Sequence, residues 1–463
     1  MDYDILIVGS GPAGQHAAWQ AARMGKKAAI IERKPHIGGT GLQTGTIPSK
    51  ALREAAYLVS RSGEHGMRHL ADPARTSHGL LADVVRRKET VIARQESVIV
   101  KRLLDSGVSL IPGEAAFVDD HTLEVVDSSG QSRRLSANII VLATGSRPRR
   151  PSDIPFDKKT VLDSTSILKL NQLPQSLTVV GGGVIACELA SIFAALGVAV
   201  TVVDSHAQLL DYLSADIVTA LSDSLTGMGV EFHMQERVVA VRREETGTLT
   251  LLESGRQLRA DAVLYALGRE PNAAGLNTAR LGIELDQGWI RVNDCFQTSV
   301  PHIYAVGDLI GRPALASTGM EQGRAAVLHA FGGETQAMAS NMPMAIYTIP
   351  EISWVGQTEK ALQQSGADYV AGRGYFRESA RGQIIGDTNG MLKINVDANS
   401  GRLLGVHIVG EHASELIHIG QLVMNYNGTV HDLVANVFNY PTLAECYRLA
   451  ALDCLERLAR QSR

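Results

Sequence analysis

Short apolar runs, glycine-rich turns and alanine-rich helical stretches alternate along the chain. The apolar run from Tyr3 to Val8 predicts a buried strand, which leads into the turn GSGPAG and a helical stretch that Gly25 ends. A second apolar strand follows and finishes at Glu32. This order predicts a strand–turn–helix–strand unit with an acidic residue at its far end.

Each part of this unit has a mechanical role in holding a dinucleotide. Gly9, Gly11 and Gly14 have the spacing G-x-G-x-x-G. The first glycine makes the turn, the second lets the backbone approach a pyrophosphate, and the third allows close packing of helix on strand. The helix N-terminus attracts phosphate charge, and Glu32 can accept hydrogen bonds from a ribose diol. We therefore predict a dinucleotide site, the alternative being a glycine-rich turn of another kind of α/β domain.

The same pattern recurs in the middle of the chain. A strand ending at Val180 precedes a small-residue turn, a helix stopped by Gly197 and a strand ending at Asp204. The small residues of this turn are Gly181, Gly183 and Ala186. Because alanine at the third position still permits close packing, we predict a second dinucleotide site in a domain of its own.

Three further segments carry structural signals. A strand is expected to end at Gly307–Asp308, ahead of a helix that contains ALASTGMEQGRAA. Alternating apolar positions around an Asn-Ser-Gly turn predict a hairpin within residues 390–410, followed by helices. Residues 62–81 contain three histidines and are expected to form an irregular, solvated insertion, with a metal site as the alternative.

Composition narrows the function classes. A chain of 463 residues is too long for one core, so two or three domains are expected. A net charge of −4 without a basic stripe argues against nucleic-acid binding, and no apolar run is long enough to cross a membrane. The N-terminus lacks a signal-peptide pattern, and the four cysteines lack metal-ligand spacing. We predict a cytoplasmic protein with no metal site.

Several motifs in combination resemble the pyridine nucleotide–disulfide oxidoreductases, a family that includes dihydrolipoamide dehydrogenase, glutathione reductase, mercuric reductase and soluble transhydrogenase. The motifs span essentially the whole chain and read GSGPAG, GTIPSK, ATGSRPRRP, GGGVIACE, ALGREPN, AVGD, IYTIPEIS and NYPTLAE. The resemblance implies an α/β fold with two Rossmann-like dinucleotide-binding domains and a C-terminal α+β dimerisation domain. It places an FAD domain at 1–150 and 270–345, an NAD(P) domain at 151–269 and the dimerisation domain at 346–463. The protein is then expected to be a homodimer or a higher homo-oligomer.

The resemblance also implies roles for individual residues. Glu32 would bind the FAD ribose and Asp308 its ribityl chain, while Lys50, paired with Glu188, would lie near the flavin N5 edge. A surface lysine beside a solvated helix glutamate is the alternative for that pair. The implied FAD-binding residues are Gly9, Gly11, Pro12, Ala13, Gly14, Glu32, Arg33, Gly39, Thr40, Gly45, Lys50, Ala115, Thr144, Gly145, Gly307, Asp308 and Ala316. The implied NAD(P)-binding residues are Gly181, Gly183, Ala186, Asp204 and Gly268.

The chain departs from the disulfide-reducing members at the positions that handle sulfur. The two cysteine positions of the loop hold Gly41 and Thr46, and the position of the basic histidine holds Tyr440, whereas Glu445 remains. A tyrosine with a pKa near ~10 is a poor base at neutral pH. We interpret this as loss of the dithiol half-reaction, with Tyr440 and Glu445 acting across the dimer. Three of the cysteines that the chain does contain, Cys187, Cys446 and Cys454, are expected to be packed in the interior.

With no dithiol, electrons must pass from the flavin to an acceptor that reaches it directly. The sequence is most similar to the soluble FAD-dependent transhydrogenases, which implies ping-pong hydride transfer between NAD(H) and NADP(H) through FAD, with Lys50, Glu188, Thr46, Tyr440 and Glu445 at the catalytic site. Asp204 favours an unphosphorylated ribose, so we expect a preference for NADH. An NADH-preferring diaphorase or quinone reductase and a non-catalytic NADH-sensing flavoprotein remain the alternatives.

Overall fold

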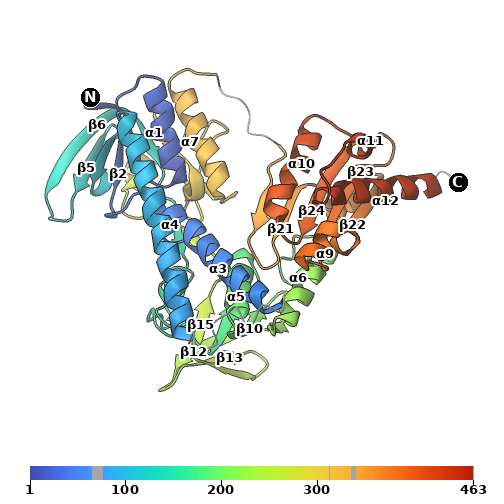
Figure 1. Ribbon diagram of the computed structural model, residues 1–463. Helices are drawn as coiled ribbons and strands as arrows, with labels where there is room; N and C mark the ends of the chain where they lie inside the picture. The colour runs from blue at the N-terminus through green and yellow to red at the C-terminus, as the bar shows by residue number, and fades with distance from the viewer. Residues whose placement is uncertain (65–76, 312, 335–339, 462–463) are drawn as a thin grey trace.

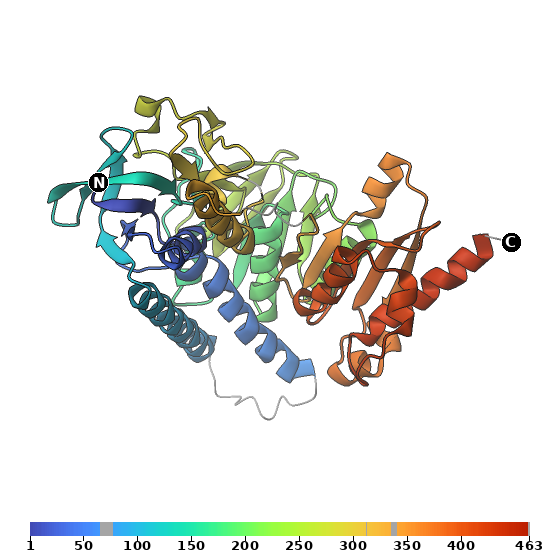
Figure 2. The same cartoon turned by 90° about the horizontal axis from the view of Figure 1, so that it is seen from above.

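The protein is described here by a computed structural model, which covers residues 1–64, 77–311, 313–334 and 340–461. Three units form the molecule (Figures 1 and 2), and each is built on its own sheet. In the view of Figure 1, the N-terminal and C-terminal units form two arms, and the middle unit lies below and between them. The predicted fold class, two dinucleotide-binding folds and a C-terminal α+β unit, is confirmed.

The N-terminal unit is a parallel sheet covered by helices. Strand β1 (Tyr3–Val8) lies at its centre, and residues 5–7 are fully buried, as an unbroken apolar strand requires when both faces are covered. The strand order is β3-β2-β1-β6, with β19 beside β6 and β4–β5 as an antiparallel extension. The remaining strands are β2 (Ala28–Glu32), β3 (Ser109–Pro112), β4 (Glu114–Phe117), β5 (Thr122–Val126), β6 (Ser132–Leu142) and β19 (Ile303–Ala305). The helices are α1 (Pro12–Arg23), α2 (Gly39–Gln43), α3 (Thr46–Glu64), α4 (Ser77–Asp105) and α7 (Ala316–Ala330).

The middle unit repeats this plan with five parallel strands in the order β11-β10-β9-β15-β8. They are β8 (Val161–Leu162), β9 (Ser176–Val180), β10 (Ala199–Asp204), β11 (Glu231–Met234) and β15 (Ala262–Tyr265), with helices α5 (Val184–Ala195) and α6 (Ala215–Gly227). An antiparallel sheet of β12 (Val238–Arg243), β13 (Thr248–Leu252) and β14 (Gln257–Ala260) lies beside it. The chain enters and leaves this unit along one antiparallel ribbon of β7 (Ser146–Pro148) and β16 (Arg269–Pro271). A small ribbon of β17 (Leu285–Asp286) and β18 (Trp289–Ile290) follows β16.

The C-terminal unit is an antiparallel sheet in the order β20-β21-β24-β23-β22. Its strands are β20 (Met344–Ile346), β21 (Ile352–Gly356), β22 (Tyr369–Tyr375), β23 (Met391–Asp397) and β24 (Leu403–Val409). Its helices are α8 (Glu359–Ser365), α9 (Ala380–Ile385), α10 (Ala413–Asn425), α11 (Val430–Ala435) and α12 (Glu445–Gln461). The pairing of β23 with β24 confirms the predicted hairpin.

An ion network fixes the middle unit against the C-terminal unit. Lys393 of β23 is fully buried and donates to Asp216 of α6 at 2.6 Å and to Glu359 of α8 at 2.8 Å. Arg373 of β22 donates to the same two carboxylates. A buried ammonium is tolerated only with such partners, so this network sets the relative position of the two units.

Two expectations about element boundaries were wrong. The strand expected to end at Gly307–Asp308 ends at Ala305, because Gly307 takes a φ of +70° and begins a 3₁₀ turn, η4 (Gly307–Ile310). Where an irregular insertion was expected at 62–81, residues 62–64 belong to α3 and residues 77–81 to α4. Residues 65–76, and the side chains of the segment's three histidines, lie outside the described residues. No helix in the described part of the chain is long and apolar enough to span a membrane.

Candidate functional site

A cavity of about 850 Å³ opens at the carboxyl ends of the N-terminal unit's parallel strands, where ligands bind in folds of this kind. The walls come from α1, the β2 end, the α2–α3 segment, α4 and the turn before α7. Of the implied FAD-binding residues, those that line it are Gly9, Gly11, Pro12, Ala13, Glu32, Arg33, Gly39, Thr40, Ala115, Thr144, Gly145, Gly307, Asp308 and Ala316. Thr46 lines it as well, whereas Gly14, Gly45 and Lys50 are not part of this lining.

The N-terminus of α1 gives the cavity an anion-binding end. Its cap residue Gly11 contributes no side-chain hydrogen bond, so the first backbone N–H groups of the helix remain available. A Cβ atom on Gly11 would have no protein atom within 4 Å, whereas one on Gly14 would lie 2.0 Å from the carbonyl oxygen of Gly9. Gly11 thus leaves room for a ligand's phosphates, and Gly14 lets the helix approach the turn closely.

Glu32 ends β2 at the edge of this turn. One carboxylate oxygen accepts from the Ser10 backbone N–H at 2.9 Å and from the Ser10 hydroxyl at 2.7 Å. The other accepts from the Lys34 backbone N–H at 2.9 Å. These bonds hold the carboxylate beside the cavity and leave acceptor capacity for a ribose diol.

Asp308 also lines the cavity and belongs to a chain of three polar side chains. The Ser146 hydroxyl donates to Asp308 at 2.7 Å and accepts from Arg269 Nε at 2.8 Å. Arg269 is 3.9 Å from the Asp308 carboxylate, and burial lowers its pKa. Sequence reasoning missed Ser146 and Arg269 as site residues, although both lie in the crossover motifs ATGSRP and ALGREPN.

These features form a cradle suited to FAD. The cavity combines a glycine-lined helix N-terminus suited to a pyrophosphate with two carboxylates, Glu32 and Asp308, that can accept from ligand hydroxyls. Its volume is that of a large-ligand pocket. The residues present therefore fit the cofactor that the motifs imply.

The segment that lacks cysteine is helical where it meets the cavity. Its backbone lies against α1, because a Cβ atom on Gly39 would be 2.7 Å from the Gly11 Cα atom, and one on Gly41 would be 2.9 Å from the Pro12 Cγ atom. The Gly38 N–H donates to the Ser10 hydroxyl at 3.0 Å. Small residues thus allow this segment to lie directly on the first turn.

Lys50 and Glu188 form the ion pair that the motifs imply. The Lys50 ammonium donates to both Glu188 oxygens at 2.8 Å, and Glu188 also accepts from the Tyr347 backbone N–H at 2.9 Å. The ammonium lies 4.6 Å from the centre of the Tyr347 ring. Burial raises the pKa of Tyr347. This contact joins all three units one turn of α3 behind Thr46, and Tyr347 was not among the expected site residues.

The second glycine-rich turn has the expected geometry. A Cβ atom on Gly181 would be 2.9 Å from the Ala266 carbonyl oxygen, and Ala186 is fully buried under the helix. Gly183 caps α5 without a side-chain hydrogen bond, as Gly11 does for α1. Gly268, with a φ of +94°, precedes Arg269 at the crossover. Asp204 ends β10 and accepts from Gly182 and from His206.

The C-terminal residues of the implied catalytic set lie elsewhere in the single chain. Tyr440 is 74% exposed, and neither it nor Glu445 lines the cavity. One carboxylate oxygen of Glu445 is buried without a hydrogen-bond partner in the described part of the chain.

The four cysteines are all free. Burial raises the pKa of Cys187, Cys446 and Cys454 to about 12. The expectation that these three are packed in the interior is confirmed. Cys295 is partly exposed, and no cysteine lines the cavity as the structure describes it.

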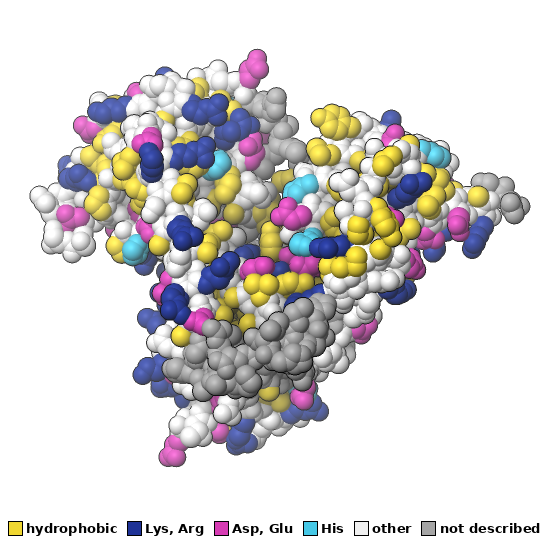
Figure 3. Space-filling model, viewed as in Figure 1, with side chains coloured by type: hydrophobic (Ala, Val, Ile, Leu, Met, Phe, Trp, Pro, Cys, Tyr) yellow, Lys and Arg dark blue, Asp and Glu magenta, His cyan; other side chains and the backbone are white. Residues whose placement is uncertain are grey.

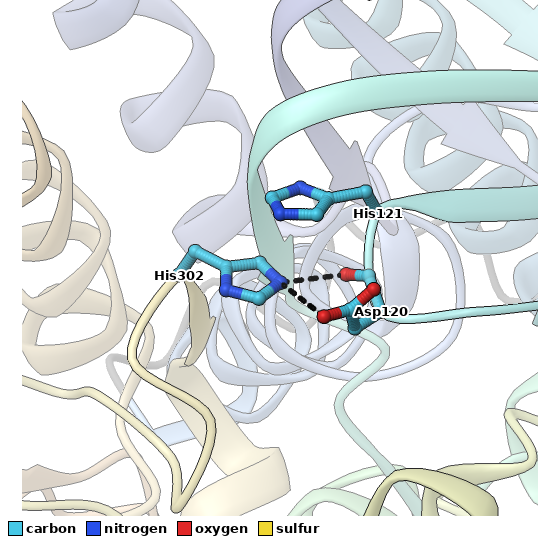
Figure 4. A group of neighbouring side chains, drawn as sticks. All are labelled: Asp120, His121 and His302. Carbon is cyan, nitrogen blue, oxygen red and sulfur yellow. Dashed lines mark hydrogen bonds and ion pairs between the residues drawn. The ribbon is translucent and has the colours of Figure 1, made fainter.

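Among the described residues, three potential metal ligands lie together in one place, Asp120, His121 and His302 (Figure 4). The two imidazole rings stack at 3.9 Å with an angle of 11° between them. His121 bonds the Ala137 carbonyl and His302 the Asp120 carbonyl, each at 2.8 Å. The stacked rings and the bond from His302 to Asp120 connect the β4–β5 turn to the residue that precedes β19. On the face shown in Figure 3, acidic and basic side chains are interspersed over the units.

Comparison with known proteins agrees with this architecture. The family model described as pyridine nucleotide-disulphide oxidoreductase matches residues 3–323, and the model of that family's dimerisation domain matches residues 342–451. The chain is 45% identical to a soluble pyridine nucleotide transhydrogenase of Mycobacterium tuberculosis, with 99% of this chain and 98% of the relative covered. It is 41% identical to the protein of the same name from Pseudomonas putida, with 99% of each covered.

Solved structures give the same picture. LpdA from Mycobacterium tuberculosis superimposes with a TM-score of 0.89 at 29% identity, covering 97% of this chain and 98% of that one. The HOCl-induced flavoprotein disulfide reductase RclA from Escherichia coli, solved as a Cu(II) complex, superimposes with a TM-score of 0.89 at 28% identity, covering 98% and 99%.

Proposed function

The chain belongs to the pyridine nucleotide-disulphide oxidoreductase family, and we propose that it is a flavoprotein transhydrogenase that exchanges hydride between NAD(H) and NADP(H). It is an oxidoreductase that uses FAD and nicotinamide dinucleotides. The bound FAD would supply a ring that takes a hydride from one nicotinamide and gives it to the next, so that the two substrates use one site in turn.

The observation that carries this proposal is the absence of thiols from the segment that faces the cavity. Gly41 and Thr46 stand where a dithiol relay would lie, and three of the four cysteines are buried elsewhere with strongly raised pKa values. A thiol relay needs an accessible thiolate and a resolving partner. An acceptor must therefore reach the cofactor itself, and a second nicotinamide is the acceptor that the full-length relatives' names support.

The chain's own residues would bind and polarise the reactants. The α1 N-terminus would hold the FAD pyrophosphate, Glu32 its ribose and Asp308, held by Ser146 and Arg269, its ribityl chain. Lys50 would hold a positive charge where negative charge develops on reduction, and Glu188 keeps that ammonium in place. The turn of Gly181 to Gly183 and Asp204 would bind the nicotinamide dinucleotide.

We extend the proposal to a second copy of the chain. The C-terminal unit matches the family's dimerisation domain, Tyr440 is exposed, and a buried oxygen of Glu445 has no partner within the described single chain. In a homodimer, Tyr440 and Glu445 would complete the partner's cofactor site.

One assay tests the proposal. Purified holoenzyme is given NADPH with thio-NAD, and separately NADH with a soluble quinone. We expect nucleotide exchange with parallel-line, ping-pong kinetics and slow quinone turnover. Rapid quinone reduction without nucleotide exchange would replace the proposal with a quinone reductase, and cofactor reduction with no turnover of either acceptor would indicate a sensor.

A matched variant tests the thiol-free character of the reaction. Complete alkylation of Cys295, the partly exposed cysteine, should leave exchange unchanged, and so should Cys295→Ser. Loss of exchange in Cys295→Ser itself, together with loss on alkylation of wild type, would show that this thiol takes part; loss on alkylation alone would indicate only that the adduct obstructs the site.

A further inference from the structure

The acid of the second dinucleotide turn is covered by its neighbour. One Asp204 oxygen accepts from the Gly182 backbone N–H, and the other accepts from the His206 backbone N–H at 2.7 Å and contacts His206 Nδ1 at 2.6 Å. The Asp204 side chain is 8% exposed, whereas that of His206 is 63% exposed. The imidazole therefore lies between the carboxylate and solvent, and no described residue bonds its Nε2 atom.

This arrangement bears on how one site accepts both nicotinamide dinucleotides. The 2′-phosphate that distinguishes NADP(H) brings about −1.5 to −2 charges to the ribose end, which an isolated carboxylate repels. An imidazolium in contact with the carboxylate makes the pair neutral overall, and its Nε2–H is a free donor for a phosphate oxygen.

We propose that His206 is the specificity residue of the second dinucleotide site: when protonated it offsets Asp204 and donates Nε2–H to the 2′-phosphate of NADP(H), and when neutral it leaves Asp204 to select NAD(H). The inference rests on the proposed function, because it explains how a transhydrogenase with an acid at this position binds both substrates.

The surroundings of His206 favour its charged form. Asp204 and Asp211 lie on its own segment, and their charges act on the ring. Across from it, the turn after β11 contributes the Gln235 N–H, which donates to the His206 carbonyl, and Glu236, whose N–H donates to the Asp204 carbonyl. The β11 histidine, His233, is engaged by Arg256. The hydrogen bond to Asp204, and then the charges of Asp204 and Asp211, raise the pKa of His206.

The direction of the pH dependence follows. The protonated fraction of His206 falls as pH rises through a pKa above the ordinary value of 6.5. Affinity for NADP⁺ relative to NAD⁺ should therefore be highest at the acid end and should fall toward alkaline pH.

Calorimetric titration of the holoenzyme with NADP⁺ and with NAD⁺ between pH 6.5 and 9 measures the two affinities without turnover. The ratio of Kd for NADP⁺ to Kd for NAD⁺ should rise about tenfold across this range in wild type. His206→Arg should keep the ratio low and flat, and His206→Gln should hold it near the alkaline value. The 2′-phosphate itself titrates near pH 6, but equally in all variants, so the difference between wild type and His206→Gln isolates the imidazole. His233→Gln is the matched control and should follow wild type.

Identical pH profiles for wild type and His206→Gln would overturn the inference, and so would a failure of NADP⁺ to bind at any pH. The hydride-exchange assay decides the proposed function separately. If hydride exchange is undiminished but the NADP⁺/NAD⁺ selectivity of the His206 variants equals that of wild type, only the role of His206 is rejected. The predicted binding profile in a protein that exchanges no hydride rejects only the transhydrogenase reaction.

Discussion

Asp204→Asn removes a charge from the second site while keeping its shape, so its consequences can be worked from the contacts. At alkaline pH, where His206 is neutral, a 2′-phosphate about 5 Å from the carboxylate is repelled by roughly 1–2 kcal/mol even at water-like screening, and this penalty disappears in the variant. The ribose of NADH loses a charged acceptor and keeps a neutral one, which costs about 1 kcal/mol. Together these changes shift selectivity toward NADPH by roughly 50-fold.

The substitution also carries a folding cost, because the carboxylate accepts on both oxygens. An asparagine can accept from His206 or from Gly182 but presents its amide N–H groups to the other donor. One unpaired donor of this kind costs about 1–3 kcal/mol, so the melting temperature should fall modestly.

Initial rates with NADH and NADPH against one fixed acceptor measure the shift, and Kd values for the oxidised dinucleotides separate binding from turnover. Ser205→Ala, adjacent in sequence, is the control and should leave selectivity unchanged. A kcat/KM ratio in Asp204→Asn within twofold of wild type would show that another residue reads the ribose.

Three further outcomes are expected. Lys50→Met should retain FAD but slow cofactor reduction by NADH about 100-fold in rapid mixing, because the charge paired with Glu188 is lost. Lys50→Arg should keep most of the rate, and a wild-type rate in Lys50→Met would show that the lysine has no part in the mechanism. Iodoacetamide at pH 8 should label Cys295 alone in the native protein, since burial raises the other three thiol pKa values to about 12, and mass spectrometry would reveal any second label. Gly323→Ala should lower the melting temperature and weaken FAD retention, because its Cβ atom would lie 2.2 Å from the Ala13 carbonyl oxygen on α1. Such overpacking costs about 1–3 kcal/mol. Gly227→Ala on α6 is the control: its Cβ atom would meet nothing within 4 Å, so the melting temperature and FAD retention should not change.

Local signals made the two dinucleotide units predictable. Strands β1, β2 and β10 end at Val8, Glu32 and Asp204, as the apolar runs and turn residues predict. In these segments the hydrophobic periodicity, the turn residues and the glycines that end the helices all indicate the same elements, so the elements depend little on the rest of the fold. The strand before Gly307 was overextended because an apolar run does not reveal that a glycine with positive φ turns the chain early.

The contacts that complete the site were beyond prediction, because they join distant parts of the chain. Ser146 reaches Asp308 across 162 positions, and the Tyr347 N–H reaches Glu188 across 159. Such pairs depend on how three units pack. His206 lies only two positions from Asp204, yet the sequence does not reveal that the imidazole ring contacts the Asp204 carboxylate through Nδ1. Residue roles at the cofactor sites accordingly stay predictions, and so do the domain boundaries.

The difference between the two glycine-rich turns bears on which ligand stays and which leaves. In the first turn, the Ser10 hydroxyl donates to Glu32 and accepts from the Gly38 N–H, so the acid, the turn and the segment covering the cavity are tied together. In the second turn, the matching residue is Gly182, whose Cβ atom would lie 3.1 Å from Asp204 Cγ, and it offers no hydroxyl for a tether. The acid there is covered by a single exposed imidazole instead. A ligand enclosed by three tied segments must disrupt them to escape, whereas one bounded by an exposed side chain with a single side-chain contact can exchange within a catalytic cycle. The same strand–turn–helix unit can thus retain a cofactor in one domain and exchange a substrate in the other.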